Sequence, residues 1–244
     1  MNSYDFDGRT IVVTGGAGGI GVECAKLLAA GGAHVHLVDP RADALEAAVE
    51  AAGPGQISTH VSALEGPDAC AAALDSAEDQ PHGLIHLAGL FEPDPFDPSV
   101  QDVWDRAIQV NLKSAYDMSV AFESRYSRDA VARMVFTASI AAGRGSPDFT
   151  PYSCAKAGLH GLVRSLAKKF SPSVLVNAVA PGIIVTRMTT DLIAQRGNYV
   201  TDGTILGRLG EPEEVAQVIA FLCSSGASYI NGQIIQVDDG TVLR

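Results

Sequence analysis

A short apolar run, TIVVT at 10–14, leads directly into a glycine-rich segment, GGAGGIG at 15–21, where a stretch of helical period begins. Glycines let the backbone turn tightly and approach a pyrophosphate, and the helix N-terminus supplies free N–H groups and about half a positive charge. This context predicts a parallel α/β sheet whose first turn binds a dinucleotide; the alternative is a turn that only packs the helix on the sheet. We expect the binding turn to consist of Gly15, Ala17, Gly18, Gly19 and Ile20.

Beyond this segment the chain keeps alternating short β-branched runs with Ala-rich stretches of helical period, which predicts repeated βαβ units. A chain of 244 residues that is 47% hydrophobic is long enough to bury one large core. We therefore predict an α/β fold, a Rossmann-type doubly wound seven-stranded parallel sheet with helices on both faces, formed by residues 1–244 as a single domain. The expected strands are 10–14, 34–38, 57–61, 84–87, 134–138, 175–180 and 233–237, and the expected helices are 19–30, 42–52, 68–76, 100–127, 151–170 and 212–224.

The segment 182–210 has neither a clear strand nor a strong helical period, and glycines at 197, 203, 207 and 210 interrupt it. Loops of this length are uncommon in compact domains unless they serve a site. We expect a mobile substrate lid near 183–206; an ordinary long surface connection is the alternative.

The second expected strand ends at Asp39, where an acidic side chain takes the adenosine ribose hydroxyls of a dinucleotide. A 2′-phosphate would lie roughly 5 Å from this carboxylate, and at an effective dielectric of about 20 to 40 the repulsion is on the order of 3 to 6 kcal/mol. Asp39 therefore favours NAD over NADP as the cofactor. Arg41 softens that preference if it turns toward the ribose, and capping of the helix near Ala42 is the alternative role of Asp39.

A serine and a tyrosine–lysine pair mark the other end of the predicted site. The fifth expected strand leads into Ser139 at the carboxyl edge of the sheet, where ligands of open α/β folds bind. Thirteen residues later comes YSCAK, in which Tyr152 and Lys156 are separated by i, i+4 and project from one face of a helix. Both side chains can therefore reach the same ligand.

TGGAGGIG, a serine thirteen residues ahead of Tyr-x-x-x-Lys, and Asn111 on a preceding helix together resemble the motifs of the short-chain dehydrogenase/reductase family. The resemblance covers essentially the whole chain, including APGIIVT and the C-terminal segment GRLGEPEEVAQVIAFLCSSGASYINGQIIQVDDG. It implies that Tyr152 is the catalytic acid/base, that Ser139 orients the substrate oxygen, and that Lys156 holds the nicotinamide ribose and favours the tyrosinate. Asn111 would join this catalytic group, its backbone tying a water to Lys156. The resemblance also implies a homo-oligomer, commonly a tetramer or dimer, and cofactor contacts from Tyr152, Lys156, Pro181, Gly182, Ile184 and Thr186.

These residue types also make chemical sense. A free tyrosine titrates near pH 10, and bringing its pKa to about 7 takes roughly 4 kcal/mol of support for the anion. A lysine about 5 Å away contributes on the order of 3 kcal/mol at an effective dielectric near 20, and an oxidised nicotinamide adds positive charge. Tyr152 would accept the alcohol proton during oxidation and return it during reduction, while Ser139 hydrogen-bonds the same oxygen. No metal is required.

The chain departs from the family pattern on the adenosine side and near its C-terminus. The usual Asn-Asn-Ala-Gly after the fourth strand is HLAG at 86–89, and the usual Asp-Val after the third strand is His60-Val61. Cofactor contacts are still expected from His60, Val61, Ala88 and Gly89. The ending VDDG replaces the common VDGG, which makes Asp239 an unexplained charge near an expected subunit contact.

Seventeen Lys and Arg against 28 Asp and Glu give a net charge of −11, which disfavours nucleic acid and anionic membranes as partners. The four cysteines form no C-x-x-C pair, and the histidines form no metal-ligand spacing with carboxylates. The N-terminus has no apolar signal, and no stretch is apolar for long enough to span a membrane. We expect a cytoplasmic protein with no metal, no nucleic-acid partner and no membrane attachment.

The sequence thus predicts an NAD-dependent enzyme that interconverts a secondary alcohol and a ketone by hydride transfer. We expect its substrate pocket between 140–149, the turn after Gly89 and the lid. Phe91, Phe149 and Met188 suggest a mostly apolar small molecule, although such side chains are also ordinary packing residues. One alternative is an NADPH-dependent reductase of 3-oxoacyl thioesters on acyl carrier protein, which Asp39 disfavours. The other is a non-catalytic dinucleotide-binding protein, which the intact Ser139, Tyr152 and Lys156 set disfavours.

Overall fold

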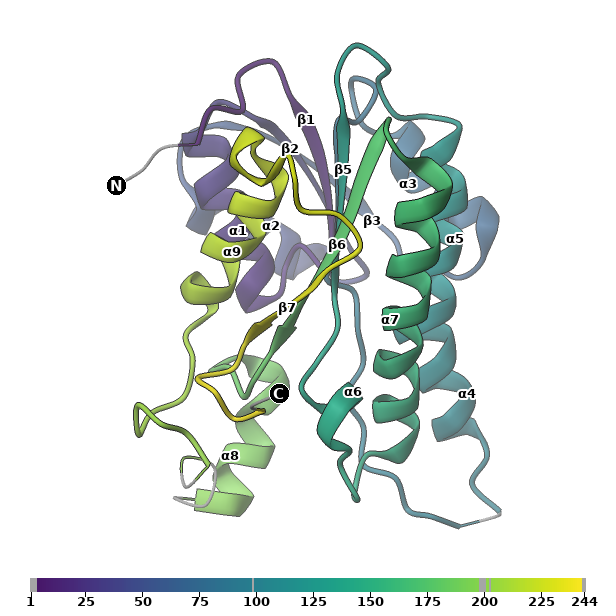
Figure 1. Ribbon diagram of the computed structural model, residues 1–244, viewed down its shortest axis with the longest axis vertical. Coiled ribbons are helices and arrows are strands. Elements are labelled where there is room, and N and C mark those ends of the chain that lie inside the picture. Colours follow the sequence, from purple (N-terminus) through teal and green to yellow (C-terminus); the bar gives the residue numbers. More distant parts are fainter. Residues whose placement is uncertain (1–3, 98, 198–200, 202, 243–244) are drawn as a thin grey trace.

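Seven parallel strands form one sheet in the order β3-β2-β1-β4-β5-β6-β7 in the computed structural model, which describes residues 4–97, 99–197, 201 and 203–242 (Figure 1). The strands are β1 Thr10–Thr14, β2 His34–Asp39, β3 Gln56–Val61, β4 Gly83–His86, β5 Ala132–Thr137, β6 Val174–Pro181 and β7 Ile234–Val237. The strand order reverses between β1 and β4, and ligands of such sheets bind beyond the carboxyl ends at that point.

Helices cover both faces of the sheet. Figure 1 shows α1, α2 and α9 on one side and α3, α4, α5 and α7 on the other. The α-helices are α1 Gly19–Ala30, α2 Ala42–Ala52, α3 Pro67–Asp75, α4 Asp102–Ile108, α5 Ser114–Glu123, α6 Ala141–Arg144, α7 Thr150–Phe170, α8 Thr190–Arg196 and α9 Pro212–Cys223. The described residues also form the π-helical turn η1 Gln109–Lys113 and the 3-10 turns η2 Arg187–Thr189 and η4 Ser225–Ala227.

The apolar core lies in two layers, one on each face of the sheet. Successive residues of a strand point to opposite faces, so Val12 packs in the layer under α3, α5 and α7, while Val13 packs in the layer under α1 and α9. β1, β2 and β4 are buried along their whole length, as expected of strands covered on both sides. The predicted doubly wound seven-stranded fold is confirmed.

The predicted single helix over 100–127 is wrong. The chain forms α4, then η1, then α5 without a gap, and η1 is a π-helical turn, which is wider than an α-helical one. Two side chains stabilise that turn, because Asn111 donates from Nδ2 to the Ala107 carbonyl at 3.0 Å and Ser114 donates to the Val110 carbonyl at 2.7 Å. Both bonds compete with regular α-helical pairing. The periodicity of the sequence does not report this competition.

The segment predicted as a lid contains η2 and α8 and leaves the body of the sheet next to β6 (Figure 1). Its two ends are held together, since Val185 N–H donates to the Gly210 carbonyl at 2.9 Å and Gly210 N–H donates to the Ile183 carbonyl at 3.1 Å. Residues 198–200 and 202 of the predicted lid lie outside the described residues. The motion of the lid remains a prediction.

Candidate active site

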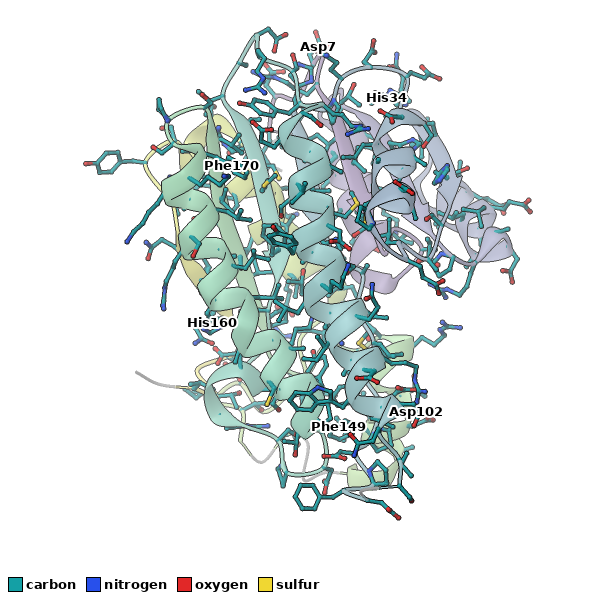
Figure 2. All side chains as sticks on the ribbon, turned by 90° about the vertical axis from the view of Figure 1, so that its right-hand side faces the viewer. Asp7, His34, Asp102, Phe149, His160 and Phe170 are labelled. Atoms are coloured by element: carbon teal, nitrogen blue, oxygen red, sulfur yellow. The ribbon has the colours of Figure 1, made fainter. Side chains whose placement is uncertain are left out.

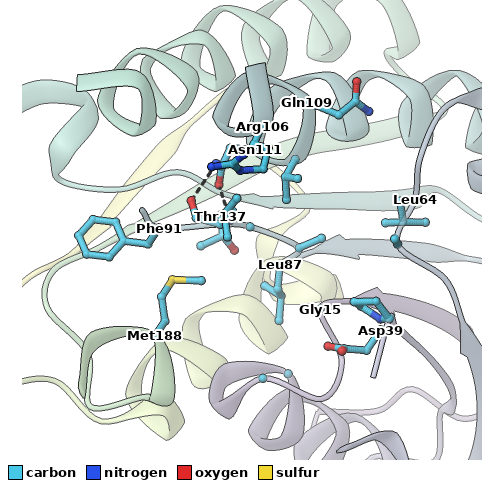
Figure 3. A pocket seen from close by; sticks show the side chains of 18 of the residues that line it. Gly15, Asp39, Leu64, Leu87, Phe91, Arg106, Gln109, Asn111, Thr137 and Met188 are labelled. Carbon is cyan, nitrogen blue, oxygen red and sulfur yellow. Dashed lines mark hydrogen bonds between the residues drawn. The ribbon is translucent and has the colours of Figure 1, made fainter. Parts of the chain in front are cut away.

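A cleft of about 1500 Å³ opens at the carboxyl ends of the strands, at the point where the strand order reverses. Figure 3 shows Asp39 and Leu64 at one end of the cleft and Phe91 and Met188 at the other. Predicted site residues that line it are Gly15, Ala17, Gly18, Gly19, Ile20, Asp39, Ala88, Gly89, Asn111, Tyr152, Lys156 and Thr186. The fold therefore gathers these residues, far apart in sequence, around one elongated space.

The glycine turn is shaped for a pyrophosphate. Gly15 has φ +65°, and a Cβ there would lie 2.8 Å from the Leu87 carbonyl carbon and from Ala88 N. Only glycine fits at position 15, because the backbone that follows β1 lies too close to the turn after β4 for a side chain. Gly18 is the N-cap of α1 and brings no side-chain acceptor to the first N–H groups of the helix. A dinucleotide pyrophosphate fits this cradle, because the N-terminus of α1 faces the cleft with its positive end.

Asp39 lies at the end of β2 with an exposure of 3%, and Arg41 turns toward it. Arg41 donates from Nε to Oδ1 at 2.9 Å and from Nη2 to Oδ2 at 3.0 Å, and Ala17 N–H donates to Oδ2 at 3.3 Å. The N-cap of α2 is Arg41, so the alternative in which Asp39 caps that helix does not hold. Arg41 is thus placed to offset the charge of Asp39, whereas the sequence had suggested only a turn of Arg41 toward the ribose.

The adenosine wall differs from the predicted one. His60 and Val61 are still inside β3, paired with Val38 and Asp39, and neither lines the cleft. The wall is formed by the five residues that follow: Ser62, Ala63, Leu64, Glu65 and Gly66. β3 therefore ends at Val61, as expected, but the residues that reach the cleft begin only after that end. The signal in the sequence was Gly66 directly before Pro67, which marks the end of the loop and the start of α3.

Tyr152 and Lys156 lie one turn apart on α7, and Lys156 Nζ is 5.6 Å from the centre of the Tyr152 ring. Lys156 is 4% exposed and donates to the Thr137 carbonyl at 2.8 Å, at the end of β5. Ser139 follows β5 by two residues and hydrogen-bonds the Tyr152 hydroxyl. Ser139 itself does not line the cleft. The three predicted catalytic side chains nevertheless come together at one place.

Burial governs the ionisation of this pair. It raises the pKa of Tyr152 above its usual value, and the hydrogen bond with Ser139 opposes that rise. It also lowers the pKa of Lys156 to about 8. Loss of contact with water favours the neutral form of both the phenol and the ammonium. A lowered tyrosine pKa is therefore not a property of the chain alone and would need additional positive charge in the cleft.

Asn111 is fully buried in η1 and holds the loop that follows β4 (Figure 3). Its Oδ1 accepts the Leu90 N–H at 3.1 Å, and its Nδ2 donates to the Leu90 carbonyl at 2.9 Å. The side chain thus positions the loop beside Gly89, a role that the sequence had not indicated. A role of the Asn111 backbone toward a water stays a prediction.

The chemical end of the cleft carries an aromatic cluster. Phe91 stacks on Phe149 with ring centres 3.9 Å apart and a 9° angle between planes, and it meets Tyr152 edge-on at 4.9 Å. Figure 2 shows Phe149 at the end of α7 that lies near Asp102 of α4. Phe149 is buried, whereas Met188 is exposed and lines the cleft. Phe149 therefore packs behind Phe91 and does not itself form the wall.

Only part of the segment 181–186, which was predicted to contact the nicotinamide, lines the cleft. Thr186 lines the cleft together with Arg187 and Met188, but Pro181, Gly182 and Ile184 do not. A Cβ at Gly182 would lie 3.1 Å from Asp238 Cα. Gly182 therefore permits close packing between the end of β6 and the segment after β7.

Asp239 has φ 54°, a conformation that suits the glycine common in the family. Its Oδ2 accepts the Leu206 N–H at 2.7 Å, so this carboxylate ties the end of the lid to the segment after β7. The structure thereby explains the charge that the sequence left unexplained.

Replacing Asp239 with Gly should loosen the lid without loss of global stability. The lost hydrogen bond is worth about 1 kcal/mol, and relief of the positive φ returns a similar amount. We expect the Leu206 amide to exchange about fivefold faster with solvent deuterium, with the free energy of unfolding unchanged within about 1 kcal/mol. Asp239→Asn, which retains an acceptor, is the matched control. Equal exchange in Asp239→Gly and the native protein would contradict the anchoring role.

Within the described ranges, no group of three or more His, Cys, Asp or Glu side chains is arranged to hold a metal ion. No helix in the same part of the chain is both long and apolar enough to cross a membrane.

Comparisons with known proteins agree with this site. The family model described as Enoyl-(Acyl carrier protein) reductase matches residues 15–242. The 3-oxoacyl-[acyl-carrier-protein] reductase FabG of Thermotoga maritima is 33% identical over 245 residues, covering 98% of this chain and 99% of that protein. The Acetoacetyl-CoA reductase of Synechocystis sp. is 36% identical over 241 residues, covering 98% of each. A crystal structure from Brucella melitensis, a short-chain dehydrogenase/reductase described as glucose/ribitol dehydrogenase, matches with a TM-score of 0.93 and 33% identity over 99% of this chain and 100% of that one.

The chain belongs to the short-chain dehydrogenase/reductase family, as its motifs predict. It is an oxidoreductase of this family, whose members bind a nicotinamide dinucleotide.

Proposed function

We propose that the protein is an NAD(H)-dependent oxidoreductase that interconverts a secondary alcohol and a ketone. The observation that carries the proposal is the hydrogen bond between Ser139 and the hydroxyl of the half-buried Tyr152, whose ring centre lies 5.6 Å from the buried ammonium of Lys156. A phenol that only packs needs a hydrogen-bond partner, but it does not need a buried cation beside it, and burying such a cation is costly. This arrangement therefore supports an acid/base role for Tyr152.

The chain's own groups then have distinct tasks. Tyr152 transfers a proton to or from the substrate oxygen, and Ser139 hydrogen-bonds that oxygen while its charge changes. Lys156, fixed by the Thr137 carbonyl, supplies positive charge toward the phenolic oxygen. The nicotinamide, when bound, supplies or accepts the hydride. Phe91 shields this end of the cleft from water and offers an apolar surface to the substrate.

The preference for NAD is supported by Asp39. Its carboxylate lies at the wall of the cleft where the adenosine ribose is expected, and a 2′-phosphate would be repelled there. Arg41 pairs with both carboxylate oxygens and reduces this repulsion. We therefore propose a preference that Asp39 creates and Arg41 moderates.

Paired titrations of the protein with NADH and NADPH, followed by cofactor fluorescence, test this proposal. We expect tighter binding of NADH by the native protein, a loss of at least tenfold in that discrimination in Asp39→Asn, and a gain in Arg41→Ala. Asp43→Asn is the matched control, because Asp43 is an exposed carboxylate in the first turn of α2. Equal or tighter binding of NADPH by the native protein would contradict the assignment of NAD.

A second candidate function is the NADPH-dependent reduction of 3-oxoacyl thioesters. The names of the Thermotoga and Synechocystis relatives favour it. A screen of ketones and secondary alcohols with the preferred cofactor, alongside an acetoacetyl thioester, separates the two functions. Turnover of the thioester with NADPH and of no simple ketone with NADH would make the second candidate the correct one. A protein that only binds dinucleotide would turn over neither.

Further features of the proposal concern assembly. We propose one domain over 1–244 with a substrate lid near 183–206, and a homo-oligomer in the cytoplasm. Tyr116 and Val120 on α5 are each about half exposed and support a subunit contact there.

A further inference from the structure

His86 ends β4 and stands where the family usually has an asparagine. It is 2% exposed and contacts two hydroxyl groups from distant elements. Its Nδ1 lies 2.9 Å from Thr14 Oγ1 at the end of β1, and its Nε2 lies 3.2 Å from Ser114 Oγ at the start of α5. The imidazole thus bridges the central strands of the sheet and the helix that follows η1.

The direction of every hydrogen bond in this bridge can be assigned. Ser114 uses its hydroxyl hydrogen to donate to the Val110 carbonyl at 2.7 Å, so its oxygen must accept from His86 Nε2–H. Nδ1 then carries no hydrogen and accepts from the Thr14 hydroxyl, whose oxygen in turn accepts the Ala88 N–H at 3.3 Å. Each hydrogen is used once. His86 is therefore a neutral imidazole protonated on Nε2.

The two ends of this chain of hydrogen bonds meet at the chemical end of the cleft. One end is the backbone of Ala88, next to Gly89, and the other is η1, which carries Asn111. A Cβ at Gly89 would lie 3.0 Å from Asn111 Oδ1 and 3.4 Å from Lys156 Nζ. A shift of η1 relative to Gly89 would therefore be felt at Lys156.

We infer that His86 is a positioning residue of the active site, which fixes η1 and Asn111 relative to the loop at Gly89 and thereby the surroundings of Lys156. It is not a proton carrier. The charged group that acts on it is Lys156, and the other groups against the ring are the two hydroxyls and the Phe136 ring. Burial and Lys156 lower the pKa of His86 to about 3, so it stays neutral while Tyr152 and Lys156 titrate.

Two variants remove the hydrogen bond between His86 Nε2 and Ser114 Oγ. His86→Asn retains a polar group at the place of Nδ1 but does not reach Ser114, and Ser114→Ala removes the acceptor itself. We expect each to lower kcat about tenfold, to leave the KM of the cofactor within about twofold, and to shift the pH profile of kcat. The double variant should lose no more than either single one, because one interaction is removed in all three.

Ser119→Ala is the matched control for Ser114→Ala. Ser119 is also buried in α5 and also donates to the carbonyl four residues earlier, at 2.6 Å to Ala115, but no imidazole of the described residues hydrogen-bonds it. Equal kcat and equal pH profiles in Ser114→Ala and Ser119→Ala would overturn the inference. If His86→Asn does not fold, the comparison of the two serine variants still decides.

The kinetic test of His86 rests on the proposed function. Nuclear magnetic resonance provides a second test that does not depend on that function. The ring nitrogens of His86 should show a proton on Nε2 throughout pH 6–9, and the side-chain amide of Asn111 should shift in Ser114→Ala but not in Ser119→Ala. A proton on Nδ1, charging of His86 within that range, or an unmoved Asn111 amide would overturn the inference. A native protein with these spectra but no turnover of any alcohol or ketone would instead count against the proposed function.

Discussion

Tyr152→Phe is expected to lower kcat by about 10³-fold while the Kd for NADH changes by less than twofold. The substitution removes the hydroxyl that Ser139 contacts and leaves the ring that packs against Phe91. Loss of a positioned acid/base typically costs 10² to 10⁴-fold in rate. The stacking partners of the ring persist, so the shape of the cleft and the affinity for the dinucleotide should persist as well. Steady-state turnover of the best substrate and fluorescence titration with NADH measure the two quantities.

Tyr229→Phe is the control for this change. Tyr229 follows η4, is fully exposed and does not line the cleft, so loss of its hydroxyl should leave kcat unchanged. Surviving turnover in Tyr152→Phe would contradict the acid/base assignment. Lost NADH binding would show that the hydroxyl serves the cofactor and not the reaction.

The second large effect is a loss of stability in mild acid. His36 and His86 are buried, and burial is the main cause that lowers their pKa values to about 4 and about 3. Both are neutral in the folded chain at pH 5, but in the unfolded chain an ordinary histidine with a pKa near 6.5 binds a proton there. Unfolding therefore takes up protons as the pH falls below about 6.5, and stability that is fully present above that value is lost. Each histidine contributes about 2 kcal/mol of loss between pH 7.5 and 5, or about 4 kcal/mol together.

Urea unfolding at pH 7.5, 6 and 5 measures this loss. His36 forms two hydrogen bonds, from Nδ1 to Ser58 Oγ at 2.7 Å and from Nε2 to Ser76 Oγ at 3.0 Å. Its replacement therefore also changes the stability at neutral pH. The slope of stability against pH is the informative quantity, because it reports only the protons taken up. His36→Leu should halve that slope between pH 6 and 5. A slope near zero in the native protein would mean that both histidines already titrate normally in the folded chain.

Local patterns were sufficient to predict the sheet and most helices. The expected bounds of 10–14, 19–30 and 42–52 agree with β1, α1 and α2, because each is a clean apolar period between glycines or charged residues. The interruption at η1 could not be predicted in this way. It depends on Asn111 and Ser114 bonding backbone carbonyls, and both residues are also compatible with a regular helix surface.

Parts of the candidate site could likewise be predicted from the sequence, and other parts could not. Ser139, Tyr152 and Lys156 could be placed together because strand ends and the i, i+4 spacing fix them relative to the sheet. The adenosine wall could not, although the end of β3 at Val61 was predicted correctly, because the loop of Ser62 to Gly66 forms that wall and has no periodic pattern. The pairing of Arg41 with Asp39 depends on a side-chain rotation, which leaves no periodic trace in the sequence.

The strand order gives the cleft two ends that can evolve separately. Residues near Asp39 and Leu64 are carried by β2 and by the loop after β3, whereas Phe91 and Met188 belong to segments after β4 and β6 (Figure 3). A change of dinucleotide can therefore be made on one half of the sheet without repacking the half that selects the substrate. β1 and β4 form the boundary between the halves. Variants intended to exchange either specificity should leave that boundary intact, because a change there would alter both at once.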